Sequence, residues 1–519
     1  MSELLQAAVG IVLVLAAWLI PRHIAKARMT RLPAGLLDFS PVLLAASLLL
    51  TATGRPIFTG FALLSLGGGF ALADRTKREA LREPVVFSDM SELPHVFTHP
   101  QLYLPFAGAG LVIGGALATI AFGIILVSVE PPLWPPDTLL LVLLIAVVCA
   151  AGWVISREPV LGLAARVLRG LNPSDELFAD AARLGPFAIL LVYGIIARAE
   201  RSARRARYAP QPAPALVSAA AAVPLVIVQC ESFFDARRVS PCVPEDLLPG
   251  FDDCRRRGAT FGRLEVAGWG ANTMRAEFAV LTGIREHDLG YDRFNPYHAF
   301  ARAPVTSLAW RLRNEGYRTV CLHPFDRSFF RRDLTLAALG FETFLGRESL
   351  GGSSRAPYRS DPDLAHQVLR VLDEEGPRTF IFVITMGNHG PWFEAGPPID
   401  PGLRQRFNPV GLPQSGQFLR YLDGLARSDE MLRILAEELG PQGRDGLLGF
   451  YGDHQPSLPE TFNYFSFNEW ESDYVLVDGG ASSARRIDMP AFHLPHVVLD
   501  RLHVRNAVTG RQAVALGAA

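Results

Sequence analysis

Cysteine and net charge are both scarce in this chain, and each scarcity excludes a class of protein. Only five of the 519 residues are cysteine, too few for the disulfide framework of a small secreted domain. The 50 lysines and arginines are balanced by 51 aspartates and glutamates, so there is no excess of positive charge for binding nucleic acid or another polyanion. Apolar residues, by contrast, make up 49% of the sequence.

The cysteines fall into two groups. Three lie in apolar runs, where buried thiols are expected: Cys149, Cys230 and Cys321. Cys242 and Cys254 lie in a polar stretch and would be able to pair in an oxidising compartment. Sequence alone does not establish that pair, so at most one disulfide bond is expected.

The apolar residues are concentrated in the N-terminal part. Five segments there approach or exceed the roughly 20 residues that cross a bilayer. They are Leu4–Ile20, Leu36–Thr53, Ile57–Ala73, Tyr103–Val127 and Thr138–Ile155. A cleaved signal peptide would explain only the first, and buried core helices would show a polar face that these segments lack. Residues 1–156 are therefore predicted to form a transmembrane domain of five helices.

The orientation of this domain depends on how the basic residues are weighed. Basic clusters near Arg22 and Arg75 follow the first and third segments, and the positive-inside rule would keep both loops in the cytoplasm. The C-terminal half would then be cytoplasmic, unless Leu184–Ala197 crossed as a sixth span. That run is short and flanked by arginines, which favours an interfacial helix. Residues 157–222 are predicted to hold this helix and a linker rich in arginine and proline.

From Pro224 onward the pattern changes to that of a water-facing α/β domain. Short apolar runs alternate with amphipathic stretches, which is typical of βαβ units. Four of the runs are predicted strands: Pro224–Cys230, Thr319–Leu322, Thr379–Thr385 and Gly446–Tyr451. Residues 223–519 are predicted to form one catalytic domain.

Polar residues follow each predicted strand. Glu231 follows the first, His323 the second and His389 the third, while Asp453 and His454 follow the fourth. These side chains are expected to meet, because ligands bind at the carboxyl ends of the strands in open α/β sheets. Carboxylate oxygens and imidazole nitrogens suit a divalent cation. Surface or capping positions are the alternative for each of them.

A candidate nucleophile lies at the start of a helix. Apolar residues recur at helical spacing from Met274 to Leu281, so a helix is predicted to begin near Thr273. A capping role for Asn272 or Thr273 is the alternative to a catalytic one. A hydroxyl at a helix N-terminus also faces free N–H groups that favour a phosphate, and a bound metal would activate it. Thr273 therefore joins Glu231 and the Asp-His pair as a candidate metal ligand.

Three further residues are candidates for contacts with a transferred phosphoryl group. Arginine binds phosphate through a two-pronged fork, which makes Arg332 a candidate, and His323 would add a second polar contact. His389 would donate a proton to a leaving alkoxide or contact an oxyanion. The alternatives are a surface helix position for Arg332 and ordinary loop positions for the two histidines.

Five motifs, in this order, resemble those of the lipoteichoic acid synthase and phosphoglycerol transferase family. That family joins a polytopic membrane domain to an alkaline-phosphatase-like domain with a mixed, mostly parallel sheet. The motifs are Cys230–Phe233, Asn272–Phe278, Ser328–Asp333, Asn388–Trp392 and Tyr451–His454. One departure is Phe330, where the family often has Trp, so a polar ring contact is lost.

The resemblance implies a role for each motif. Thr273 would be the nucleophile, and Glu231, Asp453 and His454 would ligate the metal beside it, which is expected to be Mn²⁺, with Zn²⁺ or Mg²⁺ as alternatives. Arg332 and His389 would line the glycerophosphate pocket. Related sulfatases use Cys or Ser within Cys/Ser-x-Pro-x-Arg, which is absent at Thr273–Glu277 and argues against sulfate ester cleavage.

The resemblance also implies a catalytic domain outside the cytoplasmic membrane of a bacterium, five spans and a cytoplasmic N-terminus. We adopt this topology instead of the one that the positive-inside rule favours. The expected activity is transfer of phosphoglycerol from a phosphatidylglycerol-type lipid to a glycan or polyol through a phospho-threonine. A phosphoethanolamine transferase is the alternative, although such enzymes usually carry several disulfides. A non-catalytic receptor would lack a metal ligand, yet all four are present. The sequence names neither the acceptor nor the oligomeric state.

Overall fold

The computed structural model describes residues 2–28, 32–211, 222–350, 359–393, 398–407, 409, 411–479 and 484–517. The chain divides into two compact units, Met1–Ser202 and Ala203–Ala519. All five cysteines are free thiols, including Cys242 and Cys254.

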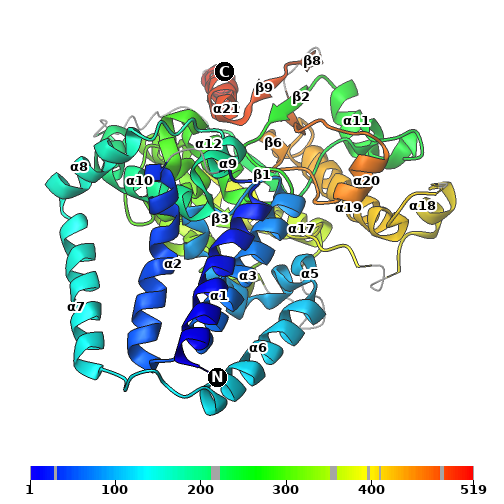
Figure 1. The fold of residues 1–519 in the computed structure, drawn as a ribbon. Helices are drawn as coiled ribbons and strands as arrows, with labels where there is room; N and C mark the ends of the chain where they lie inside the picture. Colours follow the sequence, from blue (N-terminus) through cyan, green and yellow to red (C-terminus); the bar gives the residue numbers. More distant parts are fainter. Residues whose placement is uncertain are drawn as a thin grey trace. The chain divides into compact units, whose positions relative to one another are not determined.

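The first unit is helical, and five of its helices are long and apolar enough to cross a bilayer (Figure 1). They are α1 (Glu3–Ile24), α2 (Leu32–Thr53), α3 (Pro56–Leu81), α6 (Ala109–Val129) and α7 (Thr138–Ile155). The prediction of five apolar helices is confirmed, although the fourth begins later than expected because the chain turns at Gly108, with φ +80°. The bent pair α9 (Leu177–Leu184) and α10 (Pro186–Tyr208), at 117°, passes the same test only as one broken span.

Shorter helices connect these segments. They are η1 (Phe87–Ser91), α4 (Leu93–Thr98), η2 (Pro100–Leu102), α5 (Leu104–Ala107) and α8 (Glu158–Arg169).

The segment Leu184–Ala197, for which an interfacial helix is predicted, lies mostly in α10. Its Ala188 and Ile189 are buried in a cluster with Ala25, which follows α1, and with residues of α2 and α9. The N-terminus of α10 is fixed by Asp38, whose Oδ1 accepts from Phe187 N at 2.8 Å and Ala188 N at 2.9 Å. The interfacial position of this segment stays a prediction.

The arginine-rich segment that was predicted as a linker is also helical, since α10 runs to Tyr208. Within the second unit, the Arg204 guanidinium pairs with Asp292, and Arg205 Nε donates to Ala299 O at 2.7 Å. These arginines bind the end of the helix to the catalytic unit instead of remaining in solvent.

The second unit is built on a mixed sheet with strand order β4-β3-β5-β1-β6-β7-β2-β8, and β9 also pairs with β2. Only the pairs β6–β7 and β2–β7 are antiparallel among the described residues. The strands are β1 (Leu225–Cys230), β2 (Thr260–Glu265), β3 (Arg318–Leu322), β4 (Thr343–Leu345), β5 (Thr379–Ile384), β6 (Leu447–Gly452), β7 (Ser472–Asp478), β8 (Arg485–Arg486) and β9 (Met489–Pro490). The predicted mixed, mostly parallel sheet is confirmed.

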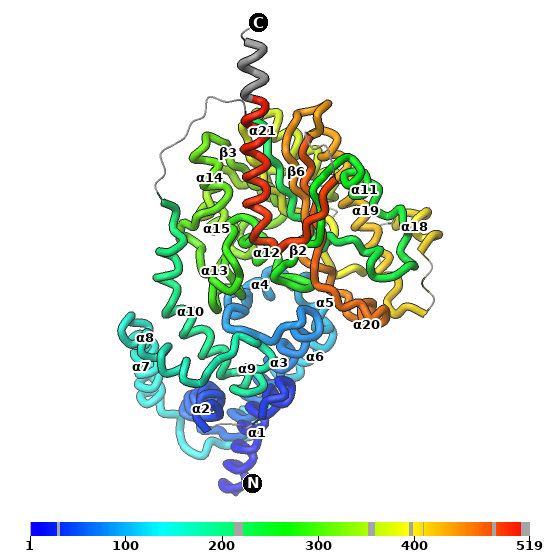
Figure 2. Tube along the Cα trace, turned by 90° about the horizontal axis from the view of Figure 1, so that it is seen from above, coloured from blue at the N-terminus to red at the C-terminus, as the bar shows by residue number. Residues whose placement is uncertain are grey.

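Helices cover both faces of this sheet. Apolar side chains of β1 alternate between the two cores: Val226 and Val228 belong to one, Leu225 and Ile227 to the other, as the two-residue period of a strand requires. The first core includes α11 (Pro249–Arg256), α16 (Arg347–Leu350), α17 (Asp361–Glu375), α18 (Pro401–Arg406), α19 (Ser415–Glu438) and α20 (Pro459–Tyr464). The second includes α12 (Thr273–Thr282), α13 (Pro296–Phe300), α14 (Leu308–Asn314), α15 (Arg332–Ala338) and α21 (Leu494–Gly517). Figure 2 shows α12 beside α21.

Short segments of 3-10 helix complete the unit. They are η3 (Ala236–Arg238), η4 (Glu245–Leu247), η5 (Glu286–Phe294), η6 (Phe329–Arg331) and η7 (Ala491–His493).

Candidate active site at the carboxyl edge of the sheet

The ends of β1 and β6 bring three of the predicted ligands together. The two strands are parallel neighbours, with Cys230 opposite Gly452, so the residues that follow them emerge side by side. Ligand atoms of Glu231, Asp453 and His454 all lie within 4.8 Å of one another, and all three residues are buried. His454 Nε2 is 3.5 Å from Glu231 Oε1 and 3.2 Å from Asp453 Oδ2.

Thr273 is the fourth member of this cluster. It is the first residue of α12, and its Oγ1 lies 3.4 Å from His454 Nε2. Thr273 is partly exposed, unlike the three buried residues beside it. Asn272 occupies the N-cap position with φ +69° but makes no side-chain capping bond in the described structure, so the capping alternative for Asn272 is not realised.

The hydrogen bonds of His454 and Asp453 indicate which of their atoms are available to bind a metal. His454 Nδ1 is 2.9 Å from Gln455 O, and a carbonyl only accepts, so Nδ1 carries a proton, and the neutral ring would offer the Nε2 lone pair to a metal. Asp453 Oδ1 accepts from Ser232 N and His454 N, each at 2.9 Å. Asp453 Oδ2 is buried and receives no hydrogen bond within the described part of the chain.

These donors fit a divalent cation. Burial, together with the charge of Asp453, raises the pKa of Glu231 to about 8, because burial and a neighbouring carboxylate both disfavour the charged form. Two carboxylates, a hydroxyl and an imidazole lone pair match the ligand types of Mn²⁺, Zn²⁺ and Mg²⁺ sites. The same atoms would otherwise be left with unsatisfied charge.

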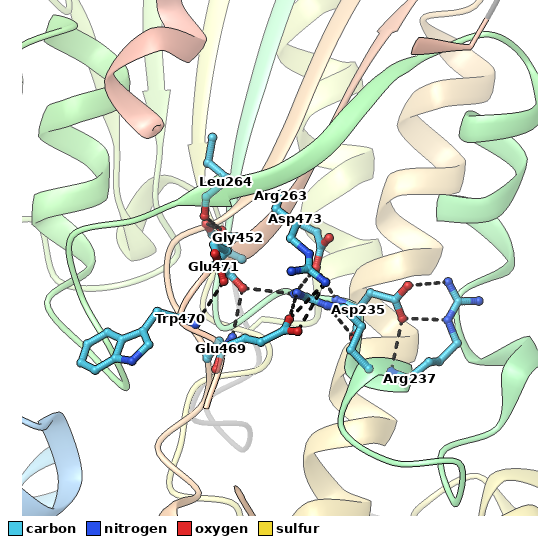
Figure 3. A network of polar contacts seen from close by, with 12 residues as sticks. Asp235, Arg237, Arg263, Leu264, Gly452, Glu469, Trp470, Glu471 and Asp473 are labelled. Atoms are coloured by element: carbon cyan, nitrogen blue, oxygen red, sulfur yellow. Dashed lines mark hydrogen bonds and ion pairs between the residues drawn. The ribbon is translucent and has the colours of Figure 1, made fainter. Parts of the chain in front are cut away.

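The carboxylate ligands are supported by neighbouring bonds. Ser232 Oγ donates to Glu231 Oε1 at 2.9 Å, and Ser232 O accepts from Tyr421 OH at 2.8 Å. After His454, Gln455 Nε2 donates to Glu471 O at 3.0 Å. Glu471 lies in the polar network of Figure 3, which connects the end of β6 to β2 and β7.

That network consists of alternating charges. Arg238 bridges Glu469 and Asp473, at 2.5 and 2.8 Å, and Arg263 reaches the same Glu469 at 3.3 Å. Ser472 Oγ donates to Gly452 O at 2.7 Å, directly before Asp453. The loop that carries two of the candidate ligands is therefore held by β7 as well as by β1.

Arg332 and His323 lie in a second buried cluster. Arg332, the first residue of α15, is only 2% exposed. Its Nε donates to Glu277 Oε2 at 3.2 Å and its Nη2 to Glu277 Oε1. Its Nη1 lies 3.2 Å from His323 Nε2. Arg332 is thus a buried residue, and the surface position considered for it is wrong.

His323 uses both ring nitrogens within the protein. Its Nδ1 lies 3.1 Å from Ile384 O, so Nδ1 donates and Nε2 accepts from Arg332. Burial, and then the Arg332 charge, holds the pKa of His323 well below its usual value. The predicted contact between His323 and substrate is not supported by this arrangement, because neither nitrogen is left to make one.

Glu277 is the residue of this cluster that sequence reasoning missed. It lies in a quoted motif, one helical turn after Thr273, and it also accepts from Tyr297 OH at 2.7 Å. A glutamate within the apolar spacing of α12 was the available signal, because a charge at such a position requires a buried partner.

His389 lies in the loop after β5 and is partly exposed. Its Nδ1 bonds to Gly390 O. Burial lowers the pKa of His389, while the charges of Asp453 and Arg332 act on it in opposite directions. The loop is anchored by Asp361 Oδ1, which accepts from Gly387 N at 3.1 Å.

Left-handed backbone at non-glycine residues adjoins these side chains. Ser232 (φ +56°) follows Glu231, Asn272 (φ +69°) precedes Thr273, and Phe330 and Arg331 (φ +55° and +58°) precede Arg332. Such conformations cost about 1–3 kcal/mol each and are concentrated at functional sites.

Comparisons with known proteins identify the family of this chain. A model of the sulfatase family matches residues 225–494. The chain is 30% identical over 446 residues to the capsular polysaccharide biosynthesis protein RkpI of Rhizobium meliloti, covering 82% of this chain and 77% of that protein.

Two solved structures are also similar. The lipooligosaccharide phosphoethanolamine transferase EptA of Neisseria meningitidis matches with 12% identity and a TM-score of 0.54, over 96% of this chain and 95% of that one. The phosphoglycerol transferase GacH of Streptococcus pyogenes, in complex with sn-glycerol-1-phosphate, matches with 20% identity and a TM-score of 0.44, over 60% and 80%. The EptA match shows a shared fold along nearly the whole chain.

Proposed function

Because this chain belongs to the sulfatase family and is a membrane phosphotransferase of the alkaline-phosphatase-like superfamily, we propose that it transfers phosphoglycerol from a phosphatidylglycerol-type lipid to a glycan or polyol. The observation that carries the proposal is the Thr273 hydroxyl, 3.4 Å from His454 Nε2 beside the buried carboxylates. The Cys/Ser-x-Pro-x-Arg pattern of sulfate ester cleavage is absent around Thr273.

The reaction has two halves. In the first, Thr273 Oγ1 bonds to the phosphorus of the lipid, the bond from phosphorus to the diacylglycerol oxygen breaks, and the threonine proton passes to that oxygen. In the second, an acceptor hydroxyl attacks the phospho-threonine, and Thr273 regains its proton. Division into two steps is the usual benefit of covalent catalysis. His389, whose Nδ1 bonds to Gly390 O, is the group that moves the proton.

The charges of the site are suited to a phosphoryl group. Glu231, Thr273, Asp453 and His454 would hold one divalent cation, Mn²⁺ in this proposal, with Zn²⁺ or Mg²⁺ as alternatives. When bound, the cation would stabilise the threonine alkoxide and the phosphoryl oxygens. Arg332 supplies a fixed positive charge that acts on both Glu231 and His389.

The donor and acceptor are inferred from different features. The apolar helices would keep a lipid donor near the catalytic domain. A glycan acceptor is supported by the name of RkpI, a capsular polysaccharide biosynthesis protein. We place the protein in a bacterial inner membrane, with a transmembrane domain at 1–156, a connecting region at 157–222 and an extracytoplasmic catalytic domain at 223–519.

The test is headgroup turnover by the full-length protein in detergent with Mn²⁺. Phosphatidylglycerol labelled in its headgroup should release diacylglycerol and leave label on the protein, and Thr273→Ala should abolish both. Thr343→Ala, on strand β4 away from the site, is the matched control. Full release by Thr273→Ala would refute the mechanism. Release from phosphatidylethanolamine alone would instead favour the phosphoethanolamine alternative.

A further inference from the structure

Glu277 has no role in the reaction described so far, yet it is a charged residue with a fully buried side chain. It pairs with Arg332, whose side chain is 3% exposed. The two carboxylate oxygens of Glu277 accept hydrogen bonds from Nε, at 3.2 Å, and from Nη2 along one edge of the guanidinium. A hydroxyl from Tyr297 at 2.7 Å fixes the carboxylate in turn. Burying this ion pair costs free energy, because both charges lose their contact with water.

The hydrogen bonds of Arg332 use some of the N–H donors of its guanidinium and leave others available. A guanidinium has five N–H groups. Glu277 takes the one on Nε and one on Nη2, and His323 takes one on Nη1. Among the described residues, one N–H therefore remains on each terminal nitrogen. Two N–H groups on neighbouring nitrogens form the fork that binds two oxygens of a phosphate.

Glu277 connects the helix that carries the nucleophile to Arg332. Phe330 and Arg331 form a left-handed turn directly before it. Glu277 is on the same helix as Thr273, one turn further along. The nucleophile and the clamp on Arg332 therefore share one rigid element.

We propose that Glu277 is a positioning residue: it holds Arg332 so that the free fork of the guanidinium meets the phosphoryl oxygens during attack by Thr273. The inference rests on the proposed function and assigns a role to a residue beyond it. Arg332 touches the transferred group, and Glu277 acts through Arg332.

The test uses Glu277→Gln in the full-length protein, because glutamine keeps the shape and removes the charge. Diacylglycerol release from phosphatidylglycerol should fall roughly 10- to 100-fold in kcat/KM, as for other misplaced catalytic groups. Inhibition by sn-glycerol-1-phosphate should weaken by a similar factor. In the double variant with Arg332→Lys, the Glu277→Gln effect should nearly vanish, since both act through one contact.

Asp292→Asn is the matched control, because it also removes a buried carboxylate paired with an arginine, Arg204. Glu277 would have a purely structural role if Glu277→Gln lowered the Tm as Asp292→Asn does and left kcat/KM and inhibition unchanged. Additive effects of Glu277→Gln and Arg332→Lys would also overturn the proposal. If Glu277→Gln does not fold, Glu277→Asp, which keeps the charge on a shorter side chain, is measured in the same way.

Failure of the proposed function is recognised separately. A wild-type protein that releases no diacylglycerol would refute phosphatidylglycerol as donor. Binding of sn-glycerol-1-phosphate, measured by calorimetry, would then still test Glu277. Weaker binding to Glu277→Gln than to Asp292→Asn supports the positioning role, and equal binding overturns it.

Discussion

At the residue scale, two of the buried charged clusters of the catalytic domain have opposite needs. Glu231 and Asp453 both lie beside the His454 imidazole, whereas Arg332 is paired with the carboxylate of Glu277. Of these two clusters, only the first has no lysine or arginine paired with its carboxylates among the described residues. It is therefore the group that should depend on an added cation.

Asp453→Asn is expected to weaken Mn²⁺ binding at least tenfold, because loss of even an outer-shell partner typically costs 10- to 100-fold in affinity. Metal content after purification and calorimetric titration of the metal-stripped protein would measure this. Asp473→Asn is the control, since Asp473 is buried and pairs with Arg238 but is not in the cluster. Equal metal content in both variants would contradict the assignment of Asp453 as a ligand.

Asn272 allows the strained backbone at the nucleophile to be tested. Its φ of +69° is tolerated by asparagine and glycine but costs roughly 1–2 kcal/mol for other residues. Asn272→Ala should lower the free energy of unfolding by about 1 kcal/mol, and Asn272→Gly should change it little. Thermal unfolding of both variants in detergent compares them. Equal losses would mean that the side chain, and not the backbone, matters here.

Sequence reasoning located those side chains whose position follows from a strand end. Glu231, Asp453 and His454 each come directly after a short apolar run, so topology alone brought them together. Glu277 could not be assigned in that way. Its partner Arg332 is 55 positions away, and no spacing rule connects them. The same clustering engages His323, whose Nε2 lies 3.2 Å from Arg332 Nη1, a contact that the sequence spacing did not predict.

At the element scale, α17 begins at Asp361, which fastens the His389 loop. Asp361 Oδ1 accepts from Gly387 N at 3.1 Å and Oδ2 from Ser428 Oγ at 2.6 Å. Burial nevertheless raises the pKa of Asp361 to about 6, whereas the pKa of an aspartate in the unfolded chain is about 3.9. Between these values the folded protein binds more protons than the unfolded chain does.

The free energy of unfolding should therefore decrease as the pH rises from about 4 to about 6, by up to roughly 3 kcal/mol from this group. Asp361→Asn should remove that slope, measured by denaturant unfolding across this pH range. Asp363→Asn, an exposed position on the same helix, is the control and should keep the slope. A slope that persists in Asp361→Asn would assign the titration to another group.

Elements were predicted well where burial is uniform. All residues of β1, β5 and β6 are buried, so each appears as a continuous apolar run. Strand β2 alternates between buried and partly exposed residues, and β8 and β9 have two residues each. Such patterns resemble loops in sequence. The end of helix α10 at Tyr208 was not predicted, because the partners that hold its arginines cannot be inferred from its own composition.

At the scale of the whole molecule, membrane topology decides where the catalytic domain works. Five candidate spans, or six with the bent pair, give opposite predictions for the same loops. With five spans and a cytoplasmic N-terminus, the loop after α1 is outside and the loop before α7 is inside. With six spans and the N-terminus outside, both assignments are reversed, while the catalytic domain remains outside.

Single cysteines in a protein whose five native cysteines are replaced by alanine should distinguish these topologies in intact spheroplasts. Ala27→Cys, after α1, is expected to react with a membrane-impermeant maleimide, and Pro136→Cys, before α7, is expected to react only after lysis. The reverse pattern would support six spans. If one crossing is added while the catalytic domain stays outside, every earlier loop moves to the opposite side of the membrane. Glu374→Cys, exposed on α17, reports on the catalytic domain itself. Protection of that position in intact cells would refute the extracytoplasmic assignment under either topology, since both require the domain to lie outside.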